Sequence, residues 1–322
     1  MYQDFYGLRD LPFELTSNPG YLFLTPRHRE ALGNLQYGLS AAKAVTLLLG
    51  EAGTGKTTLL KAALGSECCR HVTSVYLNNP TLTRDEFVET LGRAFSLSSA
   101  AARSKATLLA ELEVRLREQR AHGQFTALVV DEAQSLSIEL LEEIRLLANI
   151  ETATEKLLPV VLVGQPELGA RLEDTQLRQL KQRVALRCEV TALELPETAA
   201  YIASRIRTAG GAAHRLFTRD AVVLIHEQSR GIPRTISVIC DNALVTGFAL
   251  GRQPVDRQIV MEVCRDFRIG ARIDNPAATS SAWSSASSTS QGATPATTSD
   301  GYNGGDDAPA LLRSRLFPAR WR

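Results

Sequence analysis

The feature that most constrains this chain is a glycine-rich loop that directly follows a continuous apolar run. Residues 45–49 read VTLLL, and residues 50–58 read GEAGTGKTT. A strand, a Gly-x-x-x-x-Gly-Lys-Thr loop and a helix in this order form a P-loop, in which successive backbone N–H groups surround a phosphate chain. Glycines keep side chains out of that approach. The pattern therefore predicts a parallel-sheet fold that binds a nucleoside triphosphate.

The residue types in this loop suggest their roles. The helix that begins near Gly55 directs the positive end of its dipole at the phosphates. Lys56 is expected to reach the β- and γ-phosphates, and the Thr57 hydroxyl is expected to bind Mg²⁺. A glycine-rich turn before an ordinary helix is the alternative, and the flanking strand and apolar helix disfavour it. The residues expected to contact ATP are Gly50, Gly53, Thr54, Gly55, Lys56, Thr57 and Thr58.

A second motif predicts hydrolysis of the bound nucleotide. The apolar run at 126–130 suits a strand buried on both faces, and it ends in Asp131 and Glu132. Carboxyl ends of central parallel strands face the same crevice as the P-loop. Asp131 is then a Mg²⁺ ligand, and Glu132 is a general base that orients and deprotonates the attacking water. The alternative is an ordinary acidic helix start, which the upstream P-loop makes the weaker interpretation.

Alternating strands and helices follow, and this alternation predicts an α/β fold with helices on both faces of a parallel sheet. The expected strands are 45–49, 73–77, 126–130, 159–163 and 186–191, and the expected helices between them are 56–64, 84–95, 104–120 and 137–148. After Pro196 only helical patterns remain, at 197–209, 218–229, 233–249 and 255–268. They predict a small helical lid.

Four regions follow from these patterns. Residues 1–44 hold an aromatic-rich segment and a helix that opens at Thr25-Pro26, 45–194 form the P-loop α/β domain, and 195–269 form the lid. Residues 270–322 are rich in Ser, Thr, Ala and Gly and lack a hydrophobic period, so we expect a disordered tail.

Composition narrows the function classes. The formal net charge is +1, which carries no global signature for nucleic acid. The chain has 5 cysteines and no Cys-x-x-Cys pattern, which disfavours disulfides and zinc and indicates a reducing compartment. No signal-peptide pattern and no run near the ~18 apolar residues of a transmembrane helix occurs.

Three further positions are candidates for the site. Gln165 follows the strand 159–163 and can contact the γ-phosphate or the attacking water; otherwise it is a polar strand end before a Pro-initiated helix. Arg183 belongs to a basic cluster around 176–187, together with Arg178, Lys181 and Arg187. Three interpretations are open: Arg183 contacts the nucleotide of a neighbouring subunit, it contacts a DNA phosphate, or the cluster is a solvated helix face. Its position directly before a strand best fits the first. Arg234 follows Gly231-Ile232-Pro233 and can reach back to the phosphates.

Taken together, these motifs resemble the AAA+ ATPases, specifically the clade of bacterial general secretion pathway protein A and its relatives near exosortase and polysaccharide-export systems. The likeness covers about residues 1–268. It implies that Gln165 is sensor 1, Arg183 the arginine finger and Arg234 sensor 2, and that residues 26–30 flank the adenine. The segments that carry the resemblance are 5–8, 12–13, 37–39, 50–58, 131–134, 164–168, 182–184 and 231–234.

This resemblance implies an ATPase that couples Mg-ATP binding and hydrolysis to conformational change or assembly in secretion or envelope export. It implies a homo-oligomer with protein partners of an export system, located in the cytoplasm or peripherally at the inner membrane. A DNA-associated ATPase of the transposition target-selection type is the alternative, disfavoured by the neutral charge. A nucleotide-gated binding module without turnover is a third hypothesis, disfavoured by the Asp131–Glu132 pair.

Overall fold

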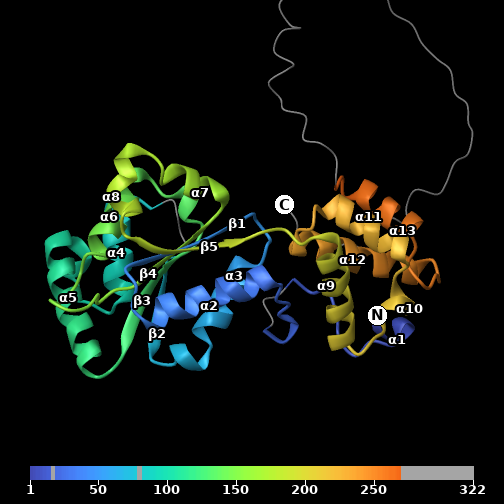
Figure 1. The fold of residues 1–322 in the computed structure, drawn as a ribbon, viewed down its shortest axis with the longest axis horizontal. Helices are drawn as coiled ribbons and strands as arrows, with labels where there is room; N and C mark the ends of the chain where they lie inside the picture. The colour runs from blue at the N-terminus through green and yellow to red at the C-terminus, as the bar shows by residue number, and fades with distance from the viewer. Residues whose placement is uncertain (16–18, 78–81, 270–322) are drawn as a thin grey trace, which may run out of the picture. The chain divides into compact units, whose positions relative to one another are not determined.

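A five-stranded parallel sheet with strand order β2-β3-β4-β1-β5 organises the molecule (Figure 1). This computed structural model describes residues 1–15, 19–77 and 82–269, and the tail expected at 270–322 lies outside them. The strands are β1 Val45–Gly50, β2 Val72–Leu77, β3 Phe125–Val130, β4 Val160–Gly164 and β5 Val184–Val190. The predicted fold class, a P-loop parallel sheet between helices, is confirmed.

The two faces of the sheet bury alternate residues of the same strands. Leu47 and Leu49 join one apolar cluster, whereas Leu48 joins the other. On the first face lie α4 Arg84–Ala94, α5 Lys105–Ala121, α6 Ile138–Leu147, α7 Pro166–Arg171 and α8 Arg178–Lys181. On the second face lie α2 Pro26–Ser40 and α3 Lys56–Leu64 (Figure 1). Because both faces are covered, the central strands read as continuous apolar runs.

One strand begins two residues earlier than the sequence indicates. We expected a strand over 186–191, and β5 instead starts at Val184, paired with Val45 of β1. β5 is an edge strand, and its residues alternate between buried Cys188 and exposed Arg187 and Glu189. It therefore lacks the continuous apolar run that marks β1, β3 and β4.

Local capping sets where several helices begin. Thr83, Ser104 and Ser137 precede α4, α5 and α6, and each side-chain oxygen accepts a hydrogen bond from a backbone N–H of the first turn. Short 3-10 turns also occur, at η1 Pro19–Tyr21, η2 Glu67–Cys69, η3 Ala101–Arg103, η4 Ala133–Ser135 and η5 Thr175–Leu177.

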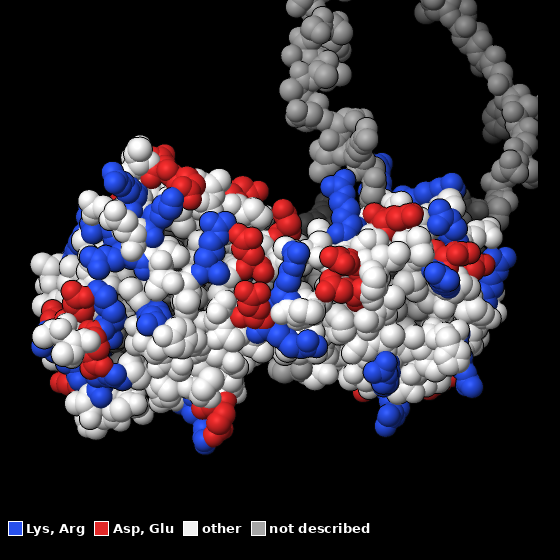
Figure 2. All heavy atoms as spheres, viewed as in Figure 1, with Lys and Arg blue, Asp and Glu red and all other residues white. Residues whose placement is uncertain are grey.

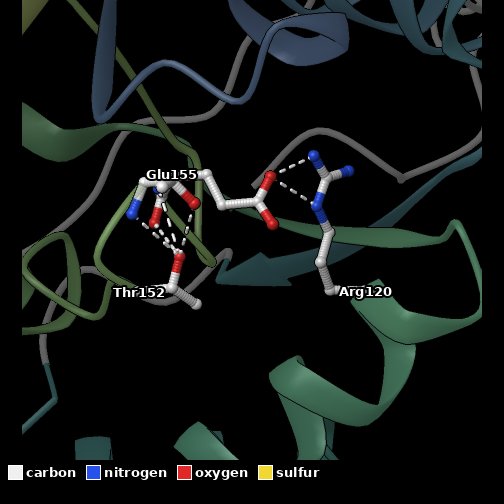
Figure 3. A network of polar contacts seen from close by, with 4 residues as sticks. Arg120, Thr152 and Glu155 are labelled. Atoms are coloured by element: carbon white, nitrogen blue, oxygen red, sulfur yellow. Dashed lines mark hydrogen bonds and ion pairs between the residues drawn. The ribbon is translucent and has the colours of Figure 1, made fainter.

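The turn before β4 is held by a polar network (Figure 3). Arg120, at the end of α5, donates from Nε to Glu155 Oε2 at 2.8 Å, and its guanidinium lies 3.7 Å from the ring centroid of Phe125. Thr152 Oγ1 accepts from the backbone N–H of Glu155 at 3.2 Å and so closes the turn. The network links the end of α5 and the first residue of β3 to the turn that precedes β4.

Helix α2 packs closely on the sheet at Gly38. A Cβ at Gly38 would lie only 2.3 Å from Thr46 Oγ1 of β1, so a larger residue would force Thr46 or the helix to shift. The Tyr37-Gly38-Leu39 step therefore has a packing role: it brings α2 against β1, next to the P-loop.

The helical lid comprises α9 Leu195–Thr208, α10 Ala213–Leu216, α11 Arg219–Ser229, α12 Pro233–Ala249 and α13 Arg257–Asp266. Its apolar core also includes Tyr2, Tyr6 and Phe13 from the start of the chain, where α1 spans Gln3–Tyr6. Tyr6 Oη donates to the Leu244 carbonyl oxygen at 3.1 Å, and burial raises the pKa of Tyr6 to about 12. The aromatic segment thus packs on the lid, whereas α2 packs on the sheet. In the described ranges no helix is both long and apolar enough to cross a membrane.

Candidate functional site

The glycine-rich loop connects β1 to α3 and encloses the amino group of Lys56. Gly55 is the N-cap of α3 and has a φ of 97°, a left-handed conformation that favours glycine. Lys56 Nζ donates to the carbonyl oxygens of Gly50 at 2.9 Å and Glu51 at 3.1 Å, and the Thr54 hydroxyl donates to the Glu51 carbonyl at 2.8 Å. Burial lowers the pKa of Lys56, and the carboxylates of Glu132 and Asp131 oppose that effect.

Asp131 meets the loop at the first turn of α3. Thr57 Oγ1 donates to Asp131 Oδ2 at 3.1 Å, and the Glu132 backbone N–H donates to Asp131 Oδ1 at 2.9 Å. A hydroxyl and a carboxylate are hard oxygen donors of the kind that Mg²⁺ prefers, and Mg²⁺ keeps several waters or phosphate oxygens besides one or two protein ligands. These two side chains therefore suit Mg²⁺ bound together with a triphosphate.

Glu132 has a strained backbone and faces the same cavity. Its φ of 53° lies in the left-handed region, which is uncommon for residues other than glycine. The Gln134 side chain donates from Nε2 to Glu132 Oε2 at 2.6 Å. The αL turn directly after β3 therefore directs the carboxylate into the cavity.

A cavity of about 360 Å³ collects most of the predicted residues. Those that line it are Gly53, Thr54, Gly55, Lys56, Thr57, Thr58, Glu132 and Arg234. Gly50 and Asp131 do not line the cavity, but they are hydrogen-bonded to the lining residues Lys56 and Thr57, respectively. Gln165 follows β4, and its backbone N–H bonds to Gln134. Arg183 is exposed at the amino end of β5, away from the edge that carries the loop.

The lid touches the loop directly. The backbone N–H of Arg234, at the start of α12, donates to the Gly53 carbonyl oxygen at 3.1 Å. Gly53 has a φ of 82°, and a Cβ on it would lie 2.8 Å from the Cβ of Arg234. Glycine at this position thus permits the lid to contact the loop.

Part of the cavity wall is absent from the sequence-based prediction. It includes residues 14–15 and 21–23, Leu193, and Tyr201, Arg205 and Ser237 of the lid. Arg205 donates to the Glu14 carbonyl oxygen at 3.0 Å and to Tyr201 Oη at 2.9 Å, and Tyr201 Oη lies 2.8 Å from Ser237 Oγ. The one available signal was the helical spacing of Tyr201 and Arg205, which is common on any helix.

His28 links α2 to the loop. Its Nδ1 lies 2.7 Å from the Thr25 hydroxyl oxygen, and its Nε2 lies 3.5 Å from the Thr54 carbonyl oxygen. Burial lowers the pKa of His28, whereas the Thr54 carbonyl and the Glu197 carboxylate act in the opposite direction. The neutral imidazole is therefore the form that the folded protein favours.

This environment predicts acid sensitivity. A folded-state pKa below the usual value of about 6.5 means that the unfolded chain binds the proton more readily. The free energy of unfolding should then fall as pH decreases below about 6.5, and His28→Gln should flatten that fall. Denaturant titrations between pH 8 and pH 5 measure it, with exposed His214→Gln as the matched control. Equal pH slopes for wild type and His28→Gln would contradict the prediction.

The fold and the loop define a P-loop protein of the AAA+ class. Residues 40–172 match the family described as AAA domain. The solved ORC2 protein of Aeropyrum pernix (ADPNP–ADP complexes) superposes with a TM-score of 0.59 at 19% identity, over 79% of this chain and 71% of that one. Cdc6p of Pyrobaculum aerophilum gives a TM-score of 0.61 at 18% identity, over 79% and 70%. At these sequence identities, the two similarities show a shared fold only.

A closer relative in sequence is General secretion pathway protein A of Aeromonas hydrophila, 39% identical over 255 residues. The match covers 79% of this chain and 46% of the relative. The AAA domain match and this sequence likeness support an AAA+ ATPase of the general secretion pathway protein A type. The chain spans less than half the length of that relative.

Proposed function

We propose that the chain binds Mg-ATP and hydrolyses it. The observation that carries this proposal is the meeting of Lys56, the Thr57–Asp131 pair and Glu132 at one cavity. In the described geometry Lys56 bonds to carbonyl oxygens of its own loop, and a triphosphate is the stronger partner for a buried ammonium group. Backbone N–H groups at the start of α3 complete the phosphate site.

Hydrolysis needs a base for the attacking water, and we assign that role to Glu132. Its carboxylate accepts the proton as the water oxygen bonds to the γ-phosphorus and the P–O bond to the β-phosphate oxygen breaks, so that ADP and inorganic phosphate are the products. Thr57 and Asp131 would hold Mg²⁺, which would neutralise charge on the phosphate oxygens when bound. Arg234 contacts the phosphates from the lid and so couples nucleotide state to the lid. Gln165, at the carboxyl end of the neighbouring strand β4, contacts the γ-phosphate or the water.

Arg183 acts on the nucleotide of a second copy of the chain. It precedes β5, which runs parallel to β1 for 7 residues. At roughly 3.3 Å per residue it stands about 20 Å from the edge that carries the loop. An exposed arginine at that distance cannot reach its own ATP, but it can reach a neighbour's. We therefore propose that the active form is a homo-oligomer.

Mixing two inactive variants tests this arrangement. Arg183→Ala keeps an intact loop, and Lys56→Ala keeps the arginine, so hydrolysis should reappear when the two are mixed. Wild-type turnover per chain should also rise with protein concentration. Steady-state phosphate release measures both effects, and Arg178→Ala, from the same basic cluster, is the control that should retain activity alone. Absence of rescue together with concentration-independent turnover would remove the oligomeric proposal.

The biological setting that we propose is secretion or envelope export, with protein partners of such a system at the inner membrane. Sequence likeness to a general secretion pathway protein supports it. The alternative is a DNA-associated ATPase. On the described part of the face shown in Figure 2, basic and acidic side chains are intermixed and no broad basic patch appears, which disfavours DNA. DNA binding with and without ATP, measured at several salt concentrations, separates the two: salt-sensitive binding would favour DNA.

A further inference from the structure

The side chain of Gln134 connects the end of β3 to the end of β4. Its Nε2 donates to Glu132 Oε2 at 2.6 Å, and its Oε1 accepts from the Gln165 backbone N–H at 3.1 Å. Gln134 and Gln165 are 31 residues apart in the chain. A single carboxamide thus uses one donor and its acceptor to join the Glu132 carboxylate to the backbone of the neighbouring strand.

The backbone around Gln134 is also held. Its carbonyl oxygen accepts a hydrogen bond from Arg171, at the end of α7, and its neighbour Ala133 is buried in the apolar core. A Cβ on Gly164 would lie 3.0 Å from Gln134 Oε1, so the glycine at the end of β4 leaves room for the carboxamide. The amide is therefore fixed from both strands and from α7.

This contact has a chemical consequence for Glu132. Hydrogen bonding to Oε2 leaves Oε1 as the oxygen without a bond to Gln134, and it limits rotation of the carboxylate. A charge-assisted bond of this kind is stronger than a neutral one. Glu132 is exposed, so the bond from Gln134 restrains a side chain that solvent would otherwise leave free to rotate.

We propose that Gln134 is a positioning residue that orients the Glu132 carboxylate toward the attacking water and couples it to the end of β4. The proposal rests on the proposed role of Glu132 as the base. Gln134 does not line the nucleotide cavity, so it acts on turnover through Glu132 and leaves nucleotide affinity to the loop.

Two substitutions at this position separate positioning from a merely structural role. Gln134→Ala removes both hydrogen bonds, and kcat should fall about 10- to 100-fold, the range expected for a lost bond to a charged group. The dissociation constant for ATP should stay within about twofold. Gln134→Glu keeps the shape and the acceptor but turns a like charge toward Glu132, so its kcat should fall further than that of Gln134→Ala. A purely structural role predicts the reverse order, because the isostere packs better.

Three quantities are measured for each variant: kcat at saturating Mg-ATP, the melting temperature, and the affinity for ATP. The affinity is measured by calorimetry in the Glu132→Gln background, where ATP is not hydrolysed during the titration. Exposed Gln124→Ala, at the opposite end of β3, is the matched control and should behave as wild type. In a Glu132→Gln background, Gln134→Ala should cause no further loss, because the group it positions is already gone.

The outcomes distinguish the two proposals. Wild-type hydrolysis by Glu132→Gln would refute the base assignment itself. Inactive Glu132→Gln combined with wild-type kcat for Gln134→Ala would refute the positioning role alone. An increase in kcat for Gln134→Ala would also refute it, because the contact would then hold the base away from the water.

Discussion

Replacing Lys56 by alanine should abolish tight ATP binding. The Lys56 ammonium group is buried at the mouth of the loop and is held by two carbonyl oxygens. A triphosphate in this position would pair with it, and charge-assisted hydrogen bonds contribute about 1.5–3 kcal/mol each. The loss of two such bonds should weaken ATP binding by at least about 100-fold. Calorimetric or fluorescence titration with Mg-ATP measures the effect.

Lys61→Ala is the matched control for that experiment. Lys61 lies on the same helix, α3, but is exposed and does not line the cavity. Its removal deletes the same charge from the chain without touching the phosphate site. Unchanged ATP affinity in Lys56→Ala would overturn the assignment of this loop to phosphate binding.

Glu132→Gln should separate binding from turnover. Glutamine has nearly the same size and shape as glutamate, but its amide cannot accept the proton of water. A positioned general base contributes about 10²- to 10⁴-fold to a rate, so kcat should fall by that factor while ATP affinity persists. Single-turnover hydrolysis and equilibrium binding measure the two effects separately. Near wild-type hydrolysis would exclude Glu132 as the base.

Substitution of the neighbouring Asp131 should have a different effect from substitution of Glu132. The two variants therefore serve as controls for each other. Asp131 bonds to the Thr57 hydroxyl, so its proposed role is to hold Mg²⁺. Asp131→Asn should therefore weaken the Mg²⁺ dependence of ATP binding, which Glu132→Gln leaves intact. Identical Mg²⁺ titrations for wild type and Asp131→Asn would contradict the separation of roles.

Much of the α/β domain could be predicted because its signals are local. A strand buried on both faces has to be apolar along its length, and β1, β3 and β4 each show that run. The loop between β1 and α3 is specified by its own glycines, Lys56 and Thr57. The parallel sheet and the crevice that brings Asp131 to Thr57 follow from these segments without knowledge of any other contact.

The start of β5 was predicted less accurately, because β5 is an edge strand and lacks a continuous apolar run. Its outward face carries Arg187 and Glu189, so alternation replaces the apolar run, and the strand begins two residues before the expected 186. Short helices were missed for a related reason: α1, α8 and α10 are 4 residues each, too short to show a period.

The sequence by itself determined the strand segments, the phosphate loop and the acidic pair, because each depends on residues adjacent in the chain. Only the tertiary structure decided which distant groups complete the site. Gln134 meets Gln165 across 31 residues, Tyr6 meets Leu244 across 238, and Arg205 joins the lid to the first segment across 191. Such contacts depend on how separate elements pack, and a glutamine or an arginine on a helix carries no local mark of the partner that packing will bring to it.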